Sequence, residues 1–102
     1  MERRGAKRIE YFCEVECEGP LPDPIRPRMR DLSATGAFIE PGTRAEEGVR
    51  LLLRFVLPSG EISVNAEVAR VTETGMGVRF LDLTEGQQAL INGAIAEDTA
   101  GD

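Results

Sequence analysis

Residues 49–81 read VRLLLRFVLPSGEISVNAEVARVTETGMGVRFL, and this stretch decides the fold class. Leucine and valine dominate residues 49–57, which predicts a long strand that ends at the Pro-Ser-Gly turn of residues 58–60. Residues 62–68 then alternate between apolar and polar side chains, the period of a strand with one buried face, and the strand is expected to run to about residue 71. A turn at residues 72–75 leads into a further strand at residues 77–81.

Shorter strands are expected upstream of this stretch. Residues 9–17 alternate between apolar and mainly acidic side chains, and Phe12 is the apolar exception on the polar side. Three prolines in residues 20–24 predict a loop, because proline fixes φ and lacks a donor. Strands are expected at residues 26–31 and 37–40, joined by a turn at residues 32–36. The apolar face of the first strand consists of Ile9, Tyr11, Cys13, Val15 and Cys17.

The pattern changes after residue 83. Thr84 and Gln87 have the spacing of a capping box, in which a hydroxyl and an amide three residues later satisfy each other's backbone N–H groups. An apolar stripe with helical spacing follows, which predicts a short amphipathic helix docked on the sheet. The last five residues are small or acidic, and we expect a disordered tail there. The stripe consists of Leu90, Ile91, Ala94 and Ile95.

Six short strands separated by turns favour a closed barrel or sandwich over a parallel sheet. We therefore expect a mainly β protein, a six-stranded antiparallel β-barrel with a C-terminal α-helix, over residues 9–97. A flexible basic arm at residues 1–8 would precede it, and residues 98–102 would form the tail.

The charge of the chain is unevenly distributed. Residues 1–8 contain four basic residues and one acidic residue, a net charge of +3, so the remaining residues carry −9 of the total of −6. An acidic body with one basic cluster is poorly suited to long nucleic acid, which needs many neutralised phosphates. The cluster fits one compact anion, or it is simply a solvated tail.

No apolar run approaches the roughly 20 residues of a membrane span. No apolar stretch follows the basic N-terminus either, so we expect neither an export signal nor membrane insertion, and predict a cytoplasmic location. Cys13 and Cys17 are four residues apart on one strand, about 13 Å, which is too far for a disulfide. Without any histidine in the chain, these thiols are expected to pack as small apolar groups and to hold no metal.

Two motifs have residue types suited to a ligand. The first is Arg4-x-x-x-Arg8, preceded by Arg3, and the second is Asp31-x-Ser33-x-x-Gly36 in a turn between strands. Each is a common pattern alone: Asp31 or Ser33 would cap its own turn, and the arginines would pair with glutamates at the surface. Their joint presence, in this order relative to the strands, is less common.

Both motifs, together with the segment Gly75-Met-Gly77-Val-Arg-Phe80, resemble the PilZ domain family over residues 2–96. The resemblance implies a PilZ-type barrel that binds cyclic di-GMP, with Arg3, Arg4, Arg8, Asp31, Ser33 and Gly36 as ligand-binding residues. Arginine suits this ligand because its planar fork pairs with guanine O6 and N7, pairs with phosphate, and stacks on purines.

The other motif residues complement the arginines. Asp31 would accept from the guanine N1–H and N2 amino groups, while Ser33 would donate to a phosphate or hold the turn. Gly36 would allow a positive φ or a close backbone approach. Ligand binding is expected to order the arginine arm on the barrel and create a surface for a downstream protein. Arg3 would stack on a second ligand molecule, which favours an intercalated cyclic di-GMP dimer.

Other functions agree less well with the sequence. A degenerate PilZ-like adaptor for proteins would need no ligand, although such loss normally removes the motif residues that are present here. A nucleic-acid barrel would need aromatic platforms along a basic groove. An enzyme is not expected, because the sequence shows no histidine, metal-ligand cluster or nucleophile with a base, and no cofactor is predicted. A homodimer would form through the helix or through Phe12.

Overall fold

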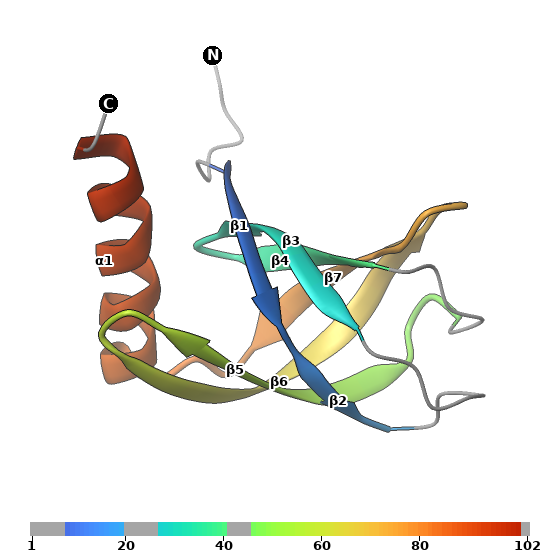
Figure 1. Cartoon of the computed structure of the whole chain (residues 1–102). Coiled ribbons are helices and arrows are strands. Elements are labelled where there is room, and N and C mark those ends of the chain that lie inside the picture. Colours follow the sequence, from blue (N-terminus) through green and yellow to red (C-terminus); the bar gives the residue numbers. More distant parts are fainter. Residues whose placement is uncertain (1–7, 20–26, 41–45, 101–102) are drawn as a thin grey trace, which may run out of the picture.

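The computed structural model describes residues 8–19, 27–40 and 46–100, which form seven strands and one helix (Figure 1). The elements follow the order that the sequence predicts, with most boundaries within one or two residues. They are β1 (Arg8–Glu14), β2 (Glu16–Glu18), β3 (Arg28–Ser33), β4 (Gly36–Glu40), β5 (Arg50–Leu57), β6 (Gly60–Val71), β7 (Met76–Leu81) and α1 (Glu85–Ala100).

The strands form one antiparallel sheet in the order β1-β3-β4-β7-β6-β5-β2. Its two outermost strands, β1 and β2, are consecutive pieces of the chain, so the sheet curls into a barrel. The predicted first strand is therefore two strands, and the count is seven instead of six. Val15 separates them: its N–H donates to the carbonyl of Pro27 at 3.1 Å. Before this residue the chain pairs with β3, and after it the chain pairs with β5.

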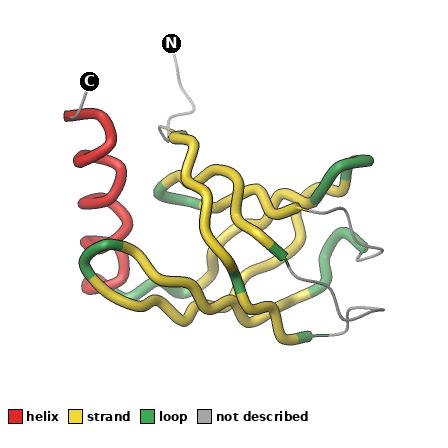
Figure 2. Tube along the Cα trace, viewed as in Figure 1, coloured by secondary structure: helices red, strands yellow, loops and turns green. Residues whose placement is uncertain are grey.

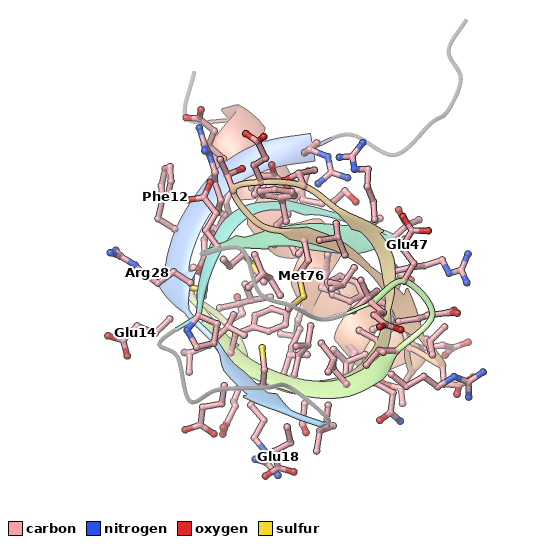
Figure 3. The ribbon with its side chains drawn as sticks, turned by 90° about the vertical axis from the view of Figure 1, so that its right-hand side faces the viewer. Phe12, Glu14, Glu18, Arg28, Glu47 and Met76 are labelled. Atoms are coloured by element: carbon pink, nitrogen blue, oxygen red, sulfur yellow. The ribbon has the colours of Figure 1, made fainter. Side chains whose placement is uncertain are left out.

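The interior of the barrel holds the apolar side chains that alternate along the strands. Figure 3 shows Met76 inside the ring of strands, whereas Phe12, Glu14, Glu18 and Arg28 point outwards. Phe55 and Phe80 are both buried, and their rings stack with centroids 6.2 Å apart. The alternation predicted for residues 9–17 and 62–68 is confirmed, including the exposed position of Phe12.

The helix stands at one end of the barrel (Figure 2). The predicted capping box is present: Gln87 N–H donates to Thr84 Oγ1 at 3.0 Å, and Thr84 N–H donates to Gln87 Oε1 at 3.1 Å. Gln87 Nε2 also donates to the carbonyl of Ser63 at 2.7 Å, which ties the first turn of the helix to β6. The predicted stripe faces the sheet, with Ile91, Ala94 and Ile95 buried.

Some sequence-based boundaries were wrong. Leu32 and Ser33 belong to β3 and Gly36 to β4, so the turn consists of residues 34 and 35 alone. Arg8 is the first residue of β1 and so is part of the barrel instead of the arm, because it pairs with Ser33. The helix continues to Ala100, three residues beyond the expected limit at residue 97. The prolines of residues 20–24 and the final residues 101–102 lie outside the described residues.

Residues 8–100, as far as they are described, contain no helix that is long and apolar enough to cross a membrane.

Candidate functional site

Arg8 and Asp31 are brought together on the outer face of the barrel. Arg8 starts β1 opposite Ser33, and Asp31 lies two residues before Ser33 on β3, opposite Glu10. The Arg8 guanidinium forms an ion pair with the Asp31 carboxylate. The Arg8 side chain is 50% exposed and that of Asp31 is 22% exposed, so both remain open to solvent. Arg3 and Arg4 lie outside the described residues.

A β-bulge directs Asp31 outwards. In β3, Met29 pairs with Ile39 of β4, but Asp31 pairs with Phe38, so Arg30 is an extra residue in the ladder. A bulge of this kind re-aims the side chains that follow it. Met29 and Leu32 point into the core with no exposed surface, and the bulge places both Arg30 and Asp31 between them on the outer face. Arg30 pairs with Glu40 at 2.6 Å, and this hydrogen bond raises the pKa of Arg30.

Ser33 is buried, and its hydroxyl is used within the hairpin turn. Ser33 Oγ accepts from the N–H groups of Thr35 and Gly36, each at 3.2 Å. The same oxygen lies 3.3 Å from the carbonyl of Gly36, to which it donates. Of the two roles that the sequence leaves open, a phosphate contact or support of the turn, the structure shows the support of the turn.

Gly36 lies against the backbone of the neighbouring strand. A Cβ at this position would be 2.1 Å from the carbonyl oxygen of Val78 in β7. Among the described residues, the glycines with a positive φ are Gly19, Gly48 and Gly60. Position 36 therefore needs glycine because the neighbouring backbone comes so close, and not because of its φ. The approaching group is the barrel's own strand β7.

The site also touches the helix. Gln88 of α1 donates through Nε2 to the carbonyl of Ala34, in the turn between Ser33 and Gly36, at 3.4 Å. The two residues are 54 positions apart in the sequence. No local pattern indicates this contact, because it depends on how the helix docks across the end of the barrel.

The arrangement presents a cationic donor and a carboxylate acceptor side by side on the outer face of the barrel. Arg8 offers a planar donor fork and Asp31 offers carboxylate acceptors. Within the described part of the chain, no group of three or more metal-ligating side chains is present. Cys13 and Cys17 are free and half-buried, and burial raises the pKa of both thiols, that of Cys17 to about 11.

The model of the PilZ domain matches residues 2–97 of this chain. The chain belongs to the PilZ domain family. The match includes the predicted arm, the whole barrel and most of the helix of this PilZ domain. A comparison with curated protein sequences found no match.

Two solved structures share the fold of this PilZ domain. The inhibitor of motility MotI/DgrA of Bacillus subtilis has a TM-score of 0.80 and 23% sequence identity, over 98% of this chain and 53% of that chain. The PilZ domain of CeSA from a cellulose synthesizing bacterium has a TM-score of 0.70 and 19% identity, over 90% of this chain and 98% of that chain. This PilZ domain therefore spans about half the length of MotI/DgrA.

Proposed function

We propose that this PilZ domain is a cytoplasmic, non-catalytic receptor for cyclic di-GMP that passes the signal to a partner protein. The observation that supports this most directly is the pairing of Arg8 with Asp31 on the outer face of the barrel. One guanine of the ligand would use its N1–H and N2 amino group to bind Asp31. Arg8 would turn from Asp31 to a phosphodiester or a guanine face.

The arginine arm completes the proposed site. Arg4 is four residues before Arg8, and Arg3 precedes it, so both are close enough along the chain to reach a ligand held at Arg8. We propose that these side chains close over the ligand and that Arg3 stacks on a second ligand molecule. The ordered arm would then create the surface that the partner recognises.

The two structural neighbours come from different contexts, an inhibitor of motility and a domain of CeSA from a cellulose synthesizing bacterium. A shared fold does not specify a shared output, because function depends on the site that each fold carries. The partner of this receptor is therefore expected to be recognised through surfaces of its own.

Isothermal titration calorimetry with cyclic di-GMP tests this proposal. The wild-type chain should bind, and Arg4→Ala, Arg8→Ala and Asp31→Ala should each weaken binding about tenfold or more, because each removes a charge-assisted or bidentate contact. Cyclic di-AMP should bind much more weakly, because adenine lacks the N1–H and N2 donors that Asp31 would accept. A titration that gives one ligand per chain would contradict the intercalated dimer.

Arg28→Ala is the matched control for these variants. Arg28 is an exposed arginine of the same strand as Asp31, three residues away, and makes no side-chain ion pair with a described residue. Its loss changes the net charge by the same amount as the loss of Arg4 or Arg8 and should leave binding unchanged. Wild-type protein that does not bind at high micromolar ligand would refute the receptor and favour a ligand-independent adaptor.

A further inference from the structure

The β6–β7 hairpin repeats the local structure of the β3–β4 hairpin that carries the Asp31 motif. In both hairpins the first strand contains one extra residue, Arg30 in β3 and Ala69 in β6. The pairs on either side of this bulge then correspond one to one. In β3–β4 they are Met29 with Ile39, Asp31 with Phe38 and Leu32 with Ala37; in β6–β7 they are Val68 with Val78, Arg70 with Gly77 and Val71 with Met76.

The turns of the two hairpins are also equivalent. Thr72 Oγ1 accepts from the N–H groups of Thr74 at 3.3 Å and Gly75 at 3.1 Å, as Ser33 Oγ does from Thr35 and Gly36. A Cβ on Gly75 would be 2.3 Å from the carbonyl oxygen of Ile39, as one on Gly36 would be from that of Val78. The hydroxyl and the glycine are therefore parts of a hairpin design that this barrel uses twice.

What differs between the hairpins is the residue that the bulge directs outwards. It is Asp31 in the first hairpin and Arg70 in the second. Because β4 pairs with β7, one row of the outer face runs across four strands through Asp31, Phe38, Gly77 and Arg70. With strands about 4.8 Å apart, Asp31 and Arg70 are separated by about 14 Å along the sheet. The Phe38–Gly77 pair lies midway between them.

The Arg70 side chain is exposed and lies beside Gly77. The position that a Cβ of Gly77 would occupy is 3.9 Å from both Cβ and Nε of Arg70, an ordinary van der Waals distance, so the arginine side chain lies next to the Gly77 position. The arginines Arg8, Arg30, Arg54 and Arg79 each have a carboxylate partner. Arg70 makes no ion pair or side-chain hydrogen bond with any residue that the structure describes, so its donor fork is available.

We infer that Arg70 is a further ligand-binding residue, at the opposite end of the site from Asp31. This inference rests on the proposed function, because it needs a cyclic dinucleotide on this face. Cyclic di-GMP has two equivalent halves, and the paired hairpins offer two equivalent backbone platforms. Asp31 takes the donor edge of one guanine, and the Arg70 fork donates to O6 and N7 of the other.

Calorimetry with cyclic di-GMP on the wild type, Arg70→Ala, Arg70→Lys and Arg28→Ala tests the inference. Arg70→Ala should weaken binding about tenfold or more, the loss of one bidentate guanine contact. Arg70→Lys should restore little of this, because lysine keeps the charge but not the planar fork. Arg28→Ala should bind like the wild type.

The outcomes separate this inference from the receptor proposal. If the wild type binds and Arg8→Ala abolishes binding while Arg70→Ala stays within twofold of the wild type, the receptor stands and the role of Arg70 is refuted. If Arg70→Lys binds like the wild type, the bidentate contact is refuted. If the wild type does not bind at all, the proposed function itself fails.

Discussion

At the scale of single residues, the Asp31-x-Ser33-x-x-Gly36 motif divides into two parts. Ser33 and Gly36 build the hairpin: the hydroxyl satisfies two backbone N–H groups, and the glycine admits the carbonyl of Val78. Asp31 points outwards with Arg8. Loss of binding in a Ser33 or Gly36 variant would therefore report a damaged turn, whereas a loss at Arg8 or Asp31 would report a lost contact.

Gly36→Ala is predicted to destabilise the domain. The new Cβ would be 2.1 Å from a backbone carbonyl oxygen that is fixed in the β4–β7 ladder, so the strands must separate. Overpacking of this kind costs about 1–3 kcal/mol of the free energy of unfolding. Urea unfolding followed by circular dichroism would measure it.

Gly93→Ala is the matched control for that substitution. Apart from the adjacent residues and the backbone of its own helix, no atom lies within 4 Å of the Cβ that it would introduce, and Gly93 lies within α1. It should stabilise the domain by up to about 1 kcal/mol, because alanine is the better helix former. Equal stability of Gly36→Ala and the wild type would show that the strands adjust and that Gly36 is not needed by the fold.

At the scale of elements, the helix is fixed by its first turn and its buried stripe. The capping box is a local interaction within the first turn of the helix. The Gln87 side-chain amide also donates a hydrogen bond to the β6 backbone, and the Gln88 amide donates one to the β3–β4 turn. The helix therefore joins β6 to the β3–β4 turn across one end of the barrel. This contact places the helix beside the turn that follows Asp31.

Thr84→Ala should reduce the free energy of unfolding by about 1 kcal/mol, the usual cost of losing an N-cap hydroxyl. The Gln87 N–H would lose its acceptor, while the apolar stripe would stay in place. Chemical denaturation measures the change. Ser63→Ala serves as the control, since the hydrogen bond from Gln87 goes to the backbone carbonyl of Ser63, which the substitution keeps. A loss of stability in that control as large as that of Thr84→Ala would argue against the cap.

At the scale of the whole molecule, the barrel closes because one segment pairs with both ends of the sheet. β1 and β2 carry Tyr11, Cys13 and Cys17, whose side chains are packed against the core at this closure. Burial raises the pKa of all three groups, that of Cys17 to about 11 from an ordinary value near 9. The folded chain therefore binds these protons more tightly than the unfolded chain does.

Stability should consequently fall at high pH. A group whose pKa is higher in the folded than in the unfolded state stabilises the fold. This contribution is complete at pH values below the pKa of the unfolded state and is lost as the pH rises through the pKa of the folded state. For Cys17 this loss spans about pH 9 to 11. Urea midpoints at pH 7, 9 and 10 should decrease in this order, and Cys17→Val, which keeps apolar packing without a titrating thiol, should reduce the decrease. An equal decrease in both proteins would exclude Cys17 as a source.

The sequence determined the class of fold and its boundaries to within a few residues. Alternation in residues 9–17 and 62–68, the Pro-Ser-Gly turn and the Thr84–Gln87 cap are local signals, and local signals survive in any tertiary arrangement. The motif residues could also be named from the sequence. The sequence could not show which of them build the turn and which face outwards, because a serine that caps a turn and a serine that binds phosphate occur in the same sequence pattern.

The tertiary structure alone decided how the pieces meet. The break at Val15, the bulges at Arg30 and Ala69, and the contact of Gly36 with β7 all depend on pairing between segments that are distant in the sequence. The row from Asp31 to Arg70 exists only because β4 pairs with β7 in one register. A shift by one residue would turn these side chains to the other face, and the register is fixed by burial of the core.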